Sequence, residues 1–229
     1  MRTDFNNGQG LHIHIRTKIE HWWSFIESAA VKIGDDTLEV HGGAQERRYW
    51  VNGKEGNRFR ASRNLPFTIG GFHGRFRAIN KVLTQYKIFL PNDQVIAIKS
   101  TKDMLRVDLL GSTEEDFGNS FGLMGAYGSG VMVGRDNETV FSDPNEFGQE
   151  WQVKHEPMLF HDVQGPQFPE QCAIPHSEPV GMQRRMLVAS IDREAAERAC
   201  ARVKYADEVE SCVSDVLATG DIDLAAAYL

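Results

Sequence analysis

The stretch QYKIFLPNDQVIAIKSTKDMLRVDLL, residues 85–110, decides the fold class of this chain. It contains three runs in which apolar and β-branched residues alternate with polar ones, at residues 85–90, 94–99 and 104–110. Such alternation predicts strands, and the intervening PND and STKD segments are rich in residues that form turns. We therefore expect an antiparallel meander joined by hairpins, which is typical of a β-sandwich or barrel.

The chain before the meander continues this pattern. Leu11, Ile13 and Ile15 alternate with His12, His14 and Arg16, which predicts a strand with one apolar and one polar face. A break at residues 34–36 predicts a hairpin from about residue 26 to residue 40, and Asn52-Gly53 is a strong signal for a second hairpin.

After the meander comes a glycine-rich stretch, FGLMGAYGSGVMVGRDNETVFSDPNEFGQEWQV, residues 121–153. Its six glycines predict a structured loop gathered against the sheet, because glycine permits left-handed backbone and close approach. We expect the loop to lead into a final strand at residues 147–153. In that strand Phe147, Gln149 and Trp151 would share one face, with Trp151 in the core.

Two motifs in this stretch resemble the von Willebrand factor type D domain. GLMGAYG at residues 122–128, followed by FGQEWQV at residues 147–153, is similar to the Gly-Leu-Cys-Gly-Asn-Tyr-Asn-Gly loop and the Phe-Gly-Asn-Ser-Trp-Lys-Val strand of that family. The resemblance implies a type D-like β domain at residues 10–157, without the family's opening Gly-Asp-Pro-His strand. It also implies structural roles for Gly122, Gly125, Phe147, Gly148 and Trp151.

The same motifs depart from the family where its calcium chemistry lies. Met124 stands where the family has a disulfide cysteine, and Ala126 and Gly128 stand where it has asparagines near a calcium ion. Calcium needs six to eight oxygen ligands, and Asp136 and Asp143 come later in the loop. We therefore expect no cofactor and at most weak calcium binding, with Asp136 stabilising the turn at residues 135–137.

The C-terminal third has a different character. Four prolines, with Pro157 just before them, predict an extended linker at residues 158–190. Residues 191–229 are predicted to be helical, because Ala195, Ala196, Ala199 and Val203 recur at helical spacing and Asp192 can cap the first helix. A second helix is expected to be interrupted at Thr219-Gly220-Asp221.

Residues 199–221 resemble the cysteine-bearing helical segment that follows type D domains. Cys200 and Cys212 flank eleven residues between two helical runs, and that family segment has cysteines in similar places. We therefore predict a Cys200–Cys212 disulfide, which leaves Cys172 free or bonded outside the chain.

Composition restricts the partners. The formal charge of −7 and the pI near 5.6 argue against nucleic acid, which binds cationic surfaces. No apolar run is long enough to span a membrane, and the first residues do not read as a signal peptide. With the resemblance, this suggests a fragment or processed form of an extracellular or cell-surface protein, in which Asn137 of the Asn-Glu-Thr sequon is a glycosylation site.

No catalytic motif stands out, and Glu114-Glu115-Asp116 is predicted to be a solvated acidic loop. The expected function is therefore a non-catalytic structural or adhesion module whose partners are other protein domains or copies of the same chain. Two alternatives stay open. One is a carbohydrate-binding β-sandwich with a glycan ligand, using Trp22, Trp23 or Tyr49-Trp50. The other is a metal-dependent hydrolase built around His12 and His14.

Overall fold

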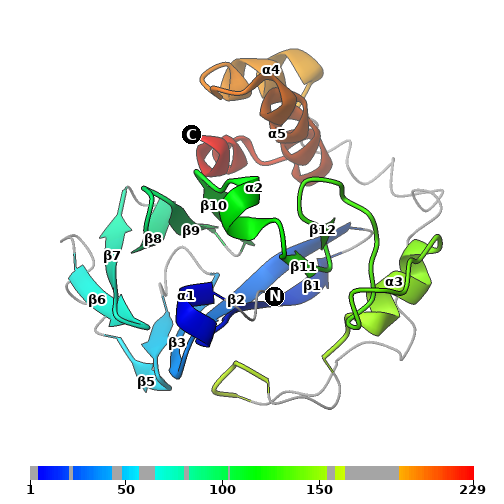
Figure 1. Cartoon of the computed structure of the whole chain (residues 1–229). Helices are drawn as coiled ribbons and strands as arrows, with labels where there is room; N and C mark the ends of the chain where they lie inside the picture. The colour runs from blue at the N-terminus through cyan, green and yellow to red at the C-terminus, as the bar shows by residue number, and fades with distance from the viewer. Residues whose placement is uncertain are drawn as a thin grey trace.

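The computed structural model describes residues 5–20, 23–42, 48–56, 65–79, 83–102, 104–153, 158–162 and 191–229. These residues form a mainly β molecule with a small helical segment at the C-terminus (Figure 1), which confirms the predicted fold class. The predicted linker at residues 158–190 lies outside the described residues except for residues 158–162.

One antiparallel sheet of ten strands makes up the body. In spatial order it runs β5-β4-β3-β2-β10-β9-β8-β7-β6, and β1 pairs with β2 beside this path. The strands are β1 (Leu11–Glu20), β2 (Trp23–Ile33), β3 (Asp36–His41), β4 (Tyr49–Val51), β5 (Lys54–Glu55), β6 (Leu65–Ile69), β7 (Phe72–Ala78), β8 (Leu83–Phe89), β9 (Val95–Thr101) and β10 (Met104–Leu110).

The predicted hairpins are confirmed. The β8-β9-β10 meander follows the alternating runs of residues 85–110, and β2 pairs with β3 across the break after Ile33. The β4–β5 turn has positive φ at both Asn52 and Gly53, 51° and 72°, the combination that a two-residue hairpin with native twist requires.

The sheet curves into a half-barrel around an apolar core. The curvature brings the β6–β7 turn to the β2–β3 turn, where the Gly70 amide donates to Asp36 Oδ2 at 2.8 Å. Gly70 has φ of +56°, and a Cβ there would lie 2.4 Å from the side chain of Ile33, so only glycine fits. The core contains Val31, Ile33, Leu38, Val40, Tyr49, Ile69, Phe76, Tyr86, Ile88, Ile96 and Ile98.

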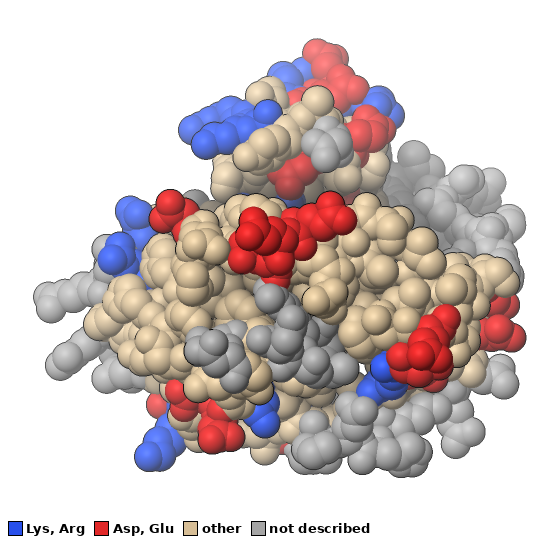
Figure 2. Space-filling model, in the orientation of Figure 1, with Lys and Arg blue, Asp and Glu red and all other residues tan. Residues whose placement is uncertain are grey.

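Short elements cover one opening of the half-barrel. The N-terminal α1 (Phe5–Gly8) and α2 (Glu114–Phe117) place Phe5 and Phe117 in the core, with their rings 6.1 Å apart. The acidic run Glu114-Glu115-Asp116 forms the first turn of α2 rather than a loop. Acidic side chains gather on the surface there (Figure 2). Their negative charge at the N-terminus of the helix stabilises it through the helix dipole.

The glycine-rich stretch begins with a small hairpin of β11 (Phe121–Gly122) and β12 (Gly125–Ala126). Gly125 is buried with φ of +83°, and a Cβ there would lie 2.6 Å from the carbonyl oxygen of Gly130. A side chain is therefore excluded at this position. Gly122 pairs with Gly125 across the hairpin, whereas a Cβ on Gly148 would meet nothing within 4 Å.

The final strand predicted at residues 147–153 is wrong. Residues 144–150 form α3 (Pro144–Glu150), with Pro144 in the first turn and Asp143 as the N-cap that accepts from the Asn145 amide at 2.7 Å. Phe147 and Trp151 are four residues apart and so lie on one helix face, which the alternation of FGQEWQV concealed. Phe147 is buried, but Trp151 is only partly buried, and its Nε1 donates to the Val133 carbonyl at 3.0 Å.

The C-terminal segment confirms the predicted helices. Asp192 caps α4 (Arg193–Cys200) by accepting from the Ala195 amide at 2.7 Å, and Gly220 ends α5 (Ala206–Thr219) in the left-handed region. A 3-10 helix, η4 (Ile222–Tyr228), follows. The predicted disulfide is present: Cys200 and Cys212 are bonded, with their Cα atoms 6.0 Å apart, inside a second small core.

Charged side chains attach this segment to the sheet. Lys99 of β9 donates to the Ala227 carbonyl at 3.1 Å, Arg106 of β10 pairs with Glu208, and Lys102 pairs with Asp221. The Arg106 guanidinium also lies 4.6 Å from the centre of the Tyr228 ring. Among the described residues, no helix is both long enough and apolar enough to cross a membrane.

Candidate metal centre

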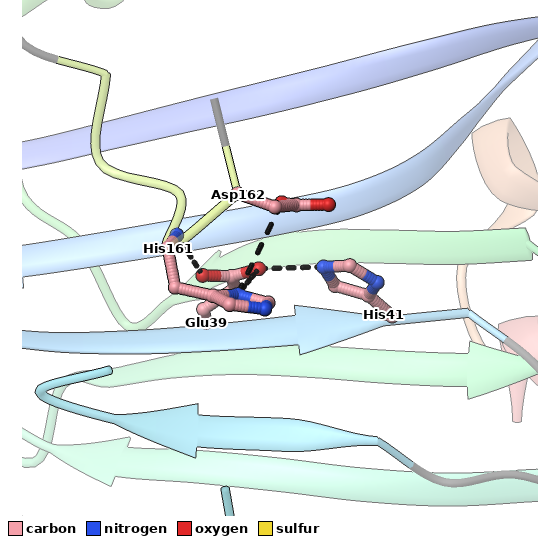
Figure 3. A group of neighbouring side chains, drawn as sticks. All are labelled: Glu39, His41, His161 and Asp162. Carbon is pink, nitrogen blue, oxygen red and sulfur yellow. Dashed lines mark hydrogen bonds and ion pairs between the residues drawn. The ribbon is translucent and has the colours of Figure 1, made fainter. Parts of the chain in front are cut away.

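Two chain segments that are far apart in sequence bring four polar side chains together. Glu39 and His41 are two residues apart in β3, so they share one face of the sheet, while Leu38 and Val40 face the core on the other. Residues 158–162 cross above this face and supply His161 and Asp162 (Figure 3). One ligand atom from each of the four residues lies within 4.8 Å of the others.

Glu39 is the centre of this cluster. Its Oε1 lies 2.5 Å from His41 Nε2 and 2.8 Å from His161 Nδ1, so two imidazole nitrogens point at one carboxylate oxygen. Its Oε2 accepts from the backbone amide of His161 at 2.7 Å. Asp162 Oδ1 lies 4.0 Å from His161 Nδ1, the same ring nitrogen that faces Glu39 (Figure 3).

Aromatic stacking orients the two imidazoles. Trp50 of β4 is the cross-strand partner of Glu39, which places its ring on the same face of the sheet. The Trp50 ring stacks on His161 with centres 4.3 Å apart and contacts His41 at 4.5 Å. Trp50 therefore packs against both imidazole rings.

Arg16 of β1 holds the other end of the segment. Its guanidinium donates to the Asp162 carbonyl at 3.0 Å and to Asp162 Oδ1 at 3.3 Å, and it lies 4.3 Å from the centre of the Phe160 ring. Phe160 itself is buried. The segment is thus attached to the sheet by the buried Phe160 ring and by polar contacts to Arg16 of β1 and Glu39 of β3.

The electrostatics of the cluster favour two negative charges. Burial alone would raise the pKa of Glu39, whose side chain is 3% exposed, but hydrogen bonds from His41 and from the amide and ring of His161 hold the pKa below its ordinary value. Burial would also raise the pKa of Asp162, and the neighbouring Arg16 guanidinium lowers it. Both carboxylates are therefore ionised at neutral pH.

Two imidazoles and two carboxylates form a donor set that suits a divalent transition metal. Imidazole nitrogen and carboxylate oxygen are both ligands of Zn²⁺, which is four-coordinate in structural sites. Calcium needs more oxygens than this cluster offers. Without a metal, the hydrogen bonds of Glu39 with His41 and His161 connect β3 to residues 158–162.

The histidines singled out in the sequence lie elsewhere. His12 lines an open depression of about 630 Å³ between the β2–β3 and β6–β7 turns, together with Lys32, Asp35 and Gly71. His14 is on β1 opposite Ala30 and is not in the four-residue cluster. The sequence signal for the four-residue cluster was Glu39-x-His41 on one face of a strand. The other two members, His161 and Asp162, are more than a hundred residues away in sequence.

Of the aromatic residues considered for sugar binding, the two whose side chains the structure describes are buried. Tyr49 and Trp50 are 8% and 4% exposed, and Tyr49 stacks on Phe76 in the core. Trp22 and the side chain of Trp23 lie outside the described residues. Stacking on a sugar needs an open ring face, which neither Tyr49 nor Trp50 offers.

The oxygens considered for calcium serve local turns instead. Asp136 Oδ1 accepts from the amides of Glu138 and Thr139 at 3.0 and 2.9 Å, and Oδ2 accepts from the Thr139 hydroxyl at 2.6 Å. These bonds lower the pKa of Asp136 to about 2. Asp143 caps α3, and within the described part of the chain neither aspartate joins a group of three metal-ligating side chains. The donors that calcium would need do not converge here.

Asn137, the sequon residue, lies in this turn. It is exposed and adopts a positive φ of 59°, which asparagine tolerates. Its side chain is therefore placed at the surface of the glycine-rich stretch.

Neither the models of known protein families nor the curated proteins include a match to this chain. The likeness to type D domains therefore rests on the two motifs and the cysteine-bearing segment alone.

Proposed function

We propose that this chain is a non-catalytic structural module of an extracellular protein, and that its four-residue cluster fastens the segment after the β domain to the sheet. The observation that carries the proposal is the state of Glu39. Both of its oxygens accept hydrogen bonds from groups of the same chain, and its side chain is 3% exposed, so this carboxylate is used within the fold.

The disulfide supports the extracellular setting. Disulfides persist in oxidising compartments, and the Cys200–Cys212 bond closes a buried core in which both sulfurs are fully buried. The motifs that resemble type D domains support the same setting, because that family occurs in extracellular multidomain proteins. The natural partners would then be neighbouring domains or further copies of the chain.

Expression in two compartments tests the setting. The chain is produced in a secretory pathway behind an added signal peptide, and separately in a reducing cytosol. We expect the secreted protein to carry the Cys200–Cys212 bond and to melt at a higher temperature than the cytosolic protein with free thiols. Equal melting temperatures, with both thiols alkylatable in the secreted form, would contradict the proposal.

An activity comparison tests the non-catalytic part. The chain and its Glu39→Gln variant are incubated with ester, peptide and phosphomonoester substrates, with and without added Zn²⁺. We expect the same background rates for both proteins. A metal-dependent turnover that Glu39→Gln abolishes would instead indicate a metal-dependent hydrolase, with its site at this cluster and not at His12 and His14.

A further inference from the structure

We infer that Glu39, His41, His161 and Asp162 bind one divalent transition-metal ion, Zn²⁺, which joins residues 158–162 to β3. The inference deepens the proposed function and rests on it for the structural role of the site, whereas the capacity to bind the ion follows from the four side chains themselves.

The arrangement of the ring nitrogens points to a shared ligand. His41 Nε2 and His161 Nδ1 approach the same oxygen of Glu39, at 2.5 and 2.8 Å. For both contacts to be hydrogen bonds, each ring must carry its proton on the nitrogen that faces Glu39, and one oxygen must accept both. A metal ion would instead be bound by all three atoms at once, because the two ring nitrogens and the Glu39 oxygen would each offer it a lone pair.

The distances suit a small coordination sphere. Ligand atoms around tetrahedral Zn²⁺ at about 2.0–2.1 Å lie roughly 3.3 Å apart. The four candidate atoms lie within 4.8 Å of one another, with contacts as short as 2.5 Å, so the required spacing falls inside the observed range. Binding then requires the His41 and Glu39 side chains of β3 to separate from 2.5 Å by rotation, and residues 161 and 162, which lie in a bend rather than in a strand, to adjust with them.

The surroundings also match those of bound metals. Two carboxylates balance the charge of a divalent ion, and metal ligands are commonly oriented by further hydrogen bonds. Here the Arg16 guanidinium donates to Asp162, and the Trp50 ring stacks on His161 and contacts His41. These contacts hold the ligands in place before any ion arrives.

The donor set selects among ions. Two nitrogens and two carboxylates favour first-row transition metals over Ca²⁺ and Mg²⁺, which prefer six or more oxygens. Cu²⁺ and Ni²⁺ would bind the same donors in a purified sample, so Zn²⁺ is the assignment for a four-coordinate site with no role in redox chemistry.

Calorimetry on the whole chain tests this inference. The metal-free protein is titrated with Zn²⁺ at neutral pH, beside the variants His41→Ala and His161→Ala and the control His73→Ala, an exposed histidine of β7. We expect one ion per chain with a micromolar or tighter Kd for the wild type and the control. Because loss of outer partners of a metal site already costs about 10–100-fold in affinity, loss of either ligand should cost at least about 100-fold.

A second measurement keeps the test valid if a variant folds poorly. Co²⁺ added to the wild-type chain should give the intense visible absorption of a four-coordinate site, and one equivalent of Zn²⁺ should remove it. No binding to the wild type, or binding that His41→Ala and His161→Ala leave unchanged, would overturn the inference. If Zn²⁺ does not bind but Glu39→Gln still releases residues 158–162 to proteolysis, the metal inference fails while the proposed structural role stands.

Discussion

At the scale of single residues, a few carboxylates depend on hydrogen-bond donors from the same chain. Glu39 is the clearest case, because a carboxylate that is 3% exposed is tolerated only when its charge is matched by donors. Two imidazoles and one amide supply them. The same principle, in a solvent-exposed setting, explains Asp136.

Replacing Glu39 by alanine should destabilise the fold. The change removes an acceptor of three hydrogen bonds and leaves His41 and His161 without their shared partner, so we expect a loss of roughly 2–4 kcal/mol in the free energy of unfolding. Urea denaturation of Glu39→Ala beside Glu115→Ala, an exposed carboxylate of α2, measures the difference. Equal midpoints for the two variants would show that the cluster does not support the fold.

Asp136 should titrate at unusually low pH. Its pKa is held at about 2 by the Thr139 hydroxyl and by two backbone amides. Because the folded pKa lies below the ordinary value, the contribution of this turn to stability is present above that value and is lost as the pH falls through 2. Carboxyl chemical shifts followed by NMR should show this, and Thr139→Val should raise the pKa while Thr139→Ser leaves it low. A pKa for Asp136 close to 4 in the wild type would refute the hydrogen-bonded turn.

At the scale of elements, local sequence signals succeeded where the contacts are local. Alternation located β8, β9 and β10, Asn52-Gly53 located its hairpin, and Asp192 located the start of α4. The α3 helix was missed because Phe147, Gln149 and Trp151 also fit a strand period, and the Asp143-Pro144 start signal was outweighed. The cluster around Glu39 was missed because no local sequence signal links Glu39 to His161, which only the fold brings together.

The N-cap of α3 provides a test at this scale. Asp143→Ala removes the acceptor for the Asn145 amide and should cost about 1 kcal/mol, whereas Asp143→Asn should retain most of the stability because asparagine also caps helices. Thermal unfolding of both variants makes the comparison. If the alanine and asparagine variants melt together at the wild-type temperature, residues 144–150 do not depend on this cap.

At the scale of the whole molecule, two devices hold the C-terminal half together. The Cys200–Cys212 bond joins α4 to α5, and charged pairs from Lys99, Lys102 and Arg106 attach the helices to the sheet. Residues 158–162 form a separate attachment at β3 and β1. Among the described residues, the chain therefore contacts the sheet again in two places after the β domain is complete.

Removing the disulfide should loosen the first of these attachments. In the chain-entropy account a loop of this length contributes about 3 kcal/mol, so the double variant Cys200→Ser/Cys212→Ser should unfold at clearly lower denaturant. Fluorescence-detected denaturation with and without a reducing agent measures the change. A wild type whose midpoint is unaffected by reduction would show that the helical segment is held by packing alone.

The most direct test of the metal site and of the attachment of residues 158–162 is a crystal structure of the chain grown with Zn²⁺, with anomalous diffraction recorded on both sides of the zinc absorption edge. We expect one strong anomalous peak between Glu39, His41, His161 and Asp162, with residues 158–162 seated across β3. A map with no peak there, or with zinc bound at His12 or at the glycine-rich loop instead, would contradict this expectation.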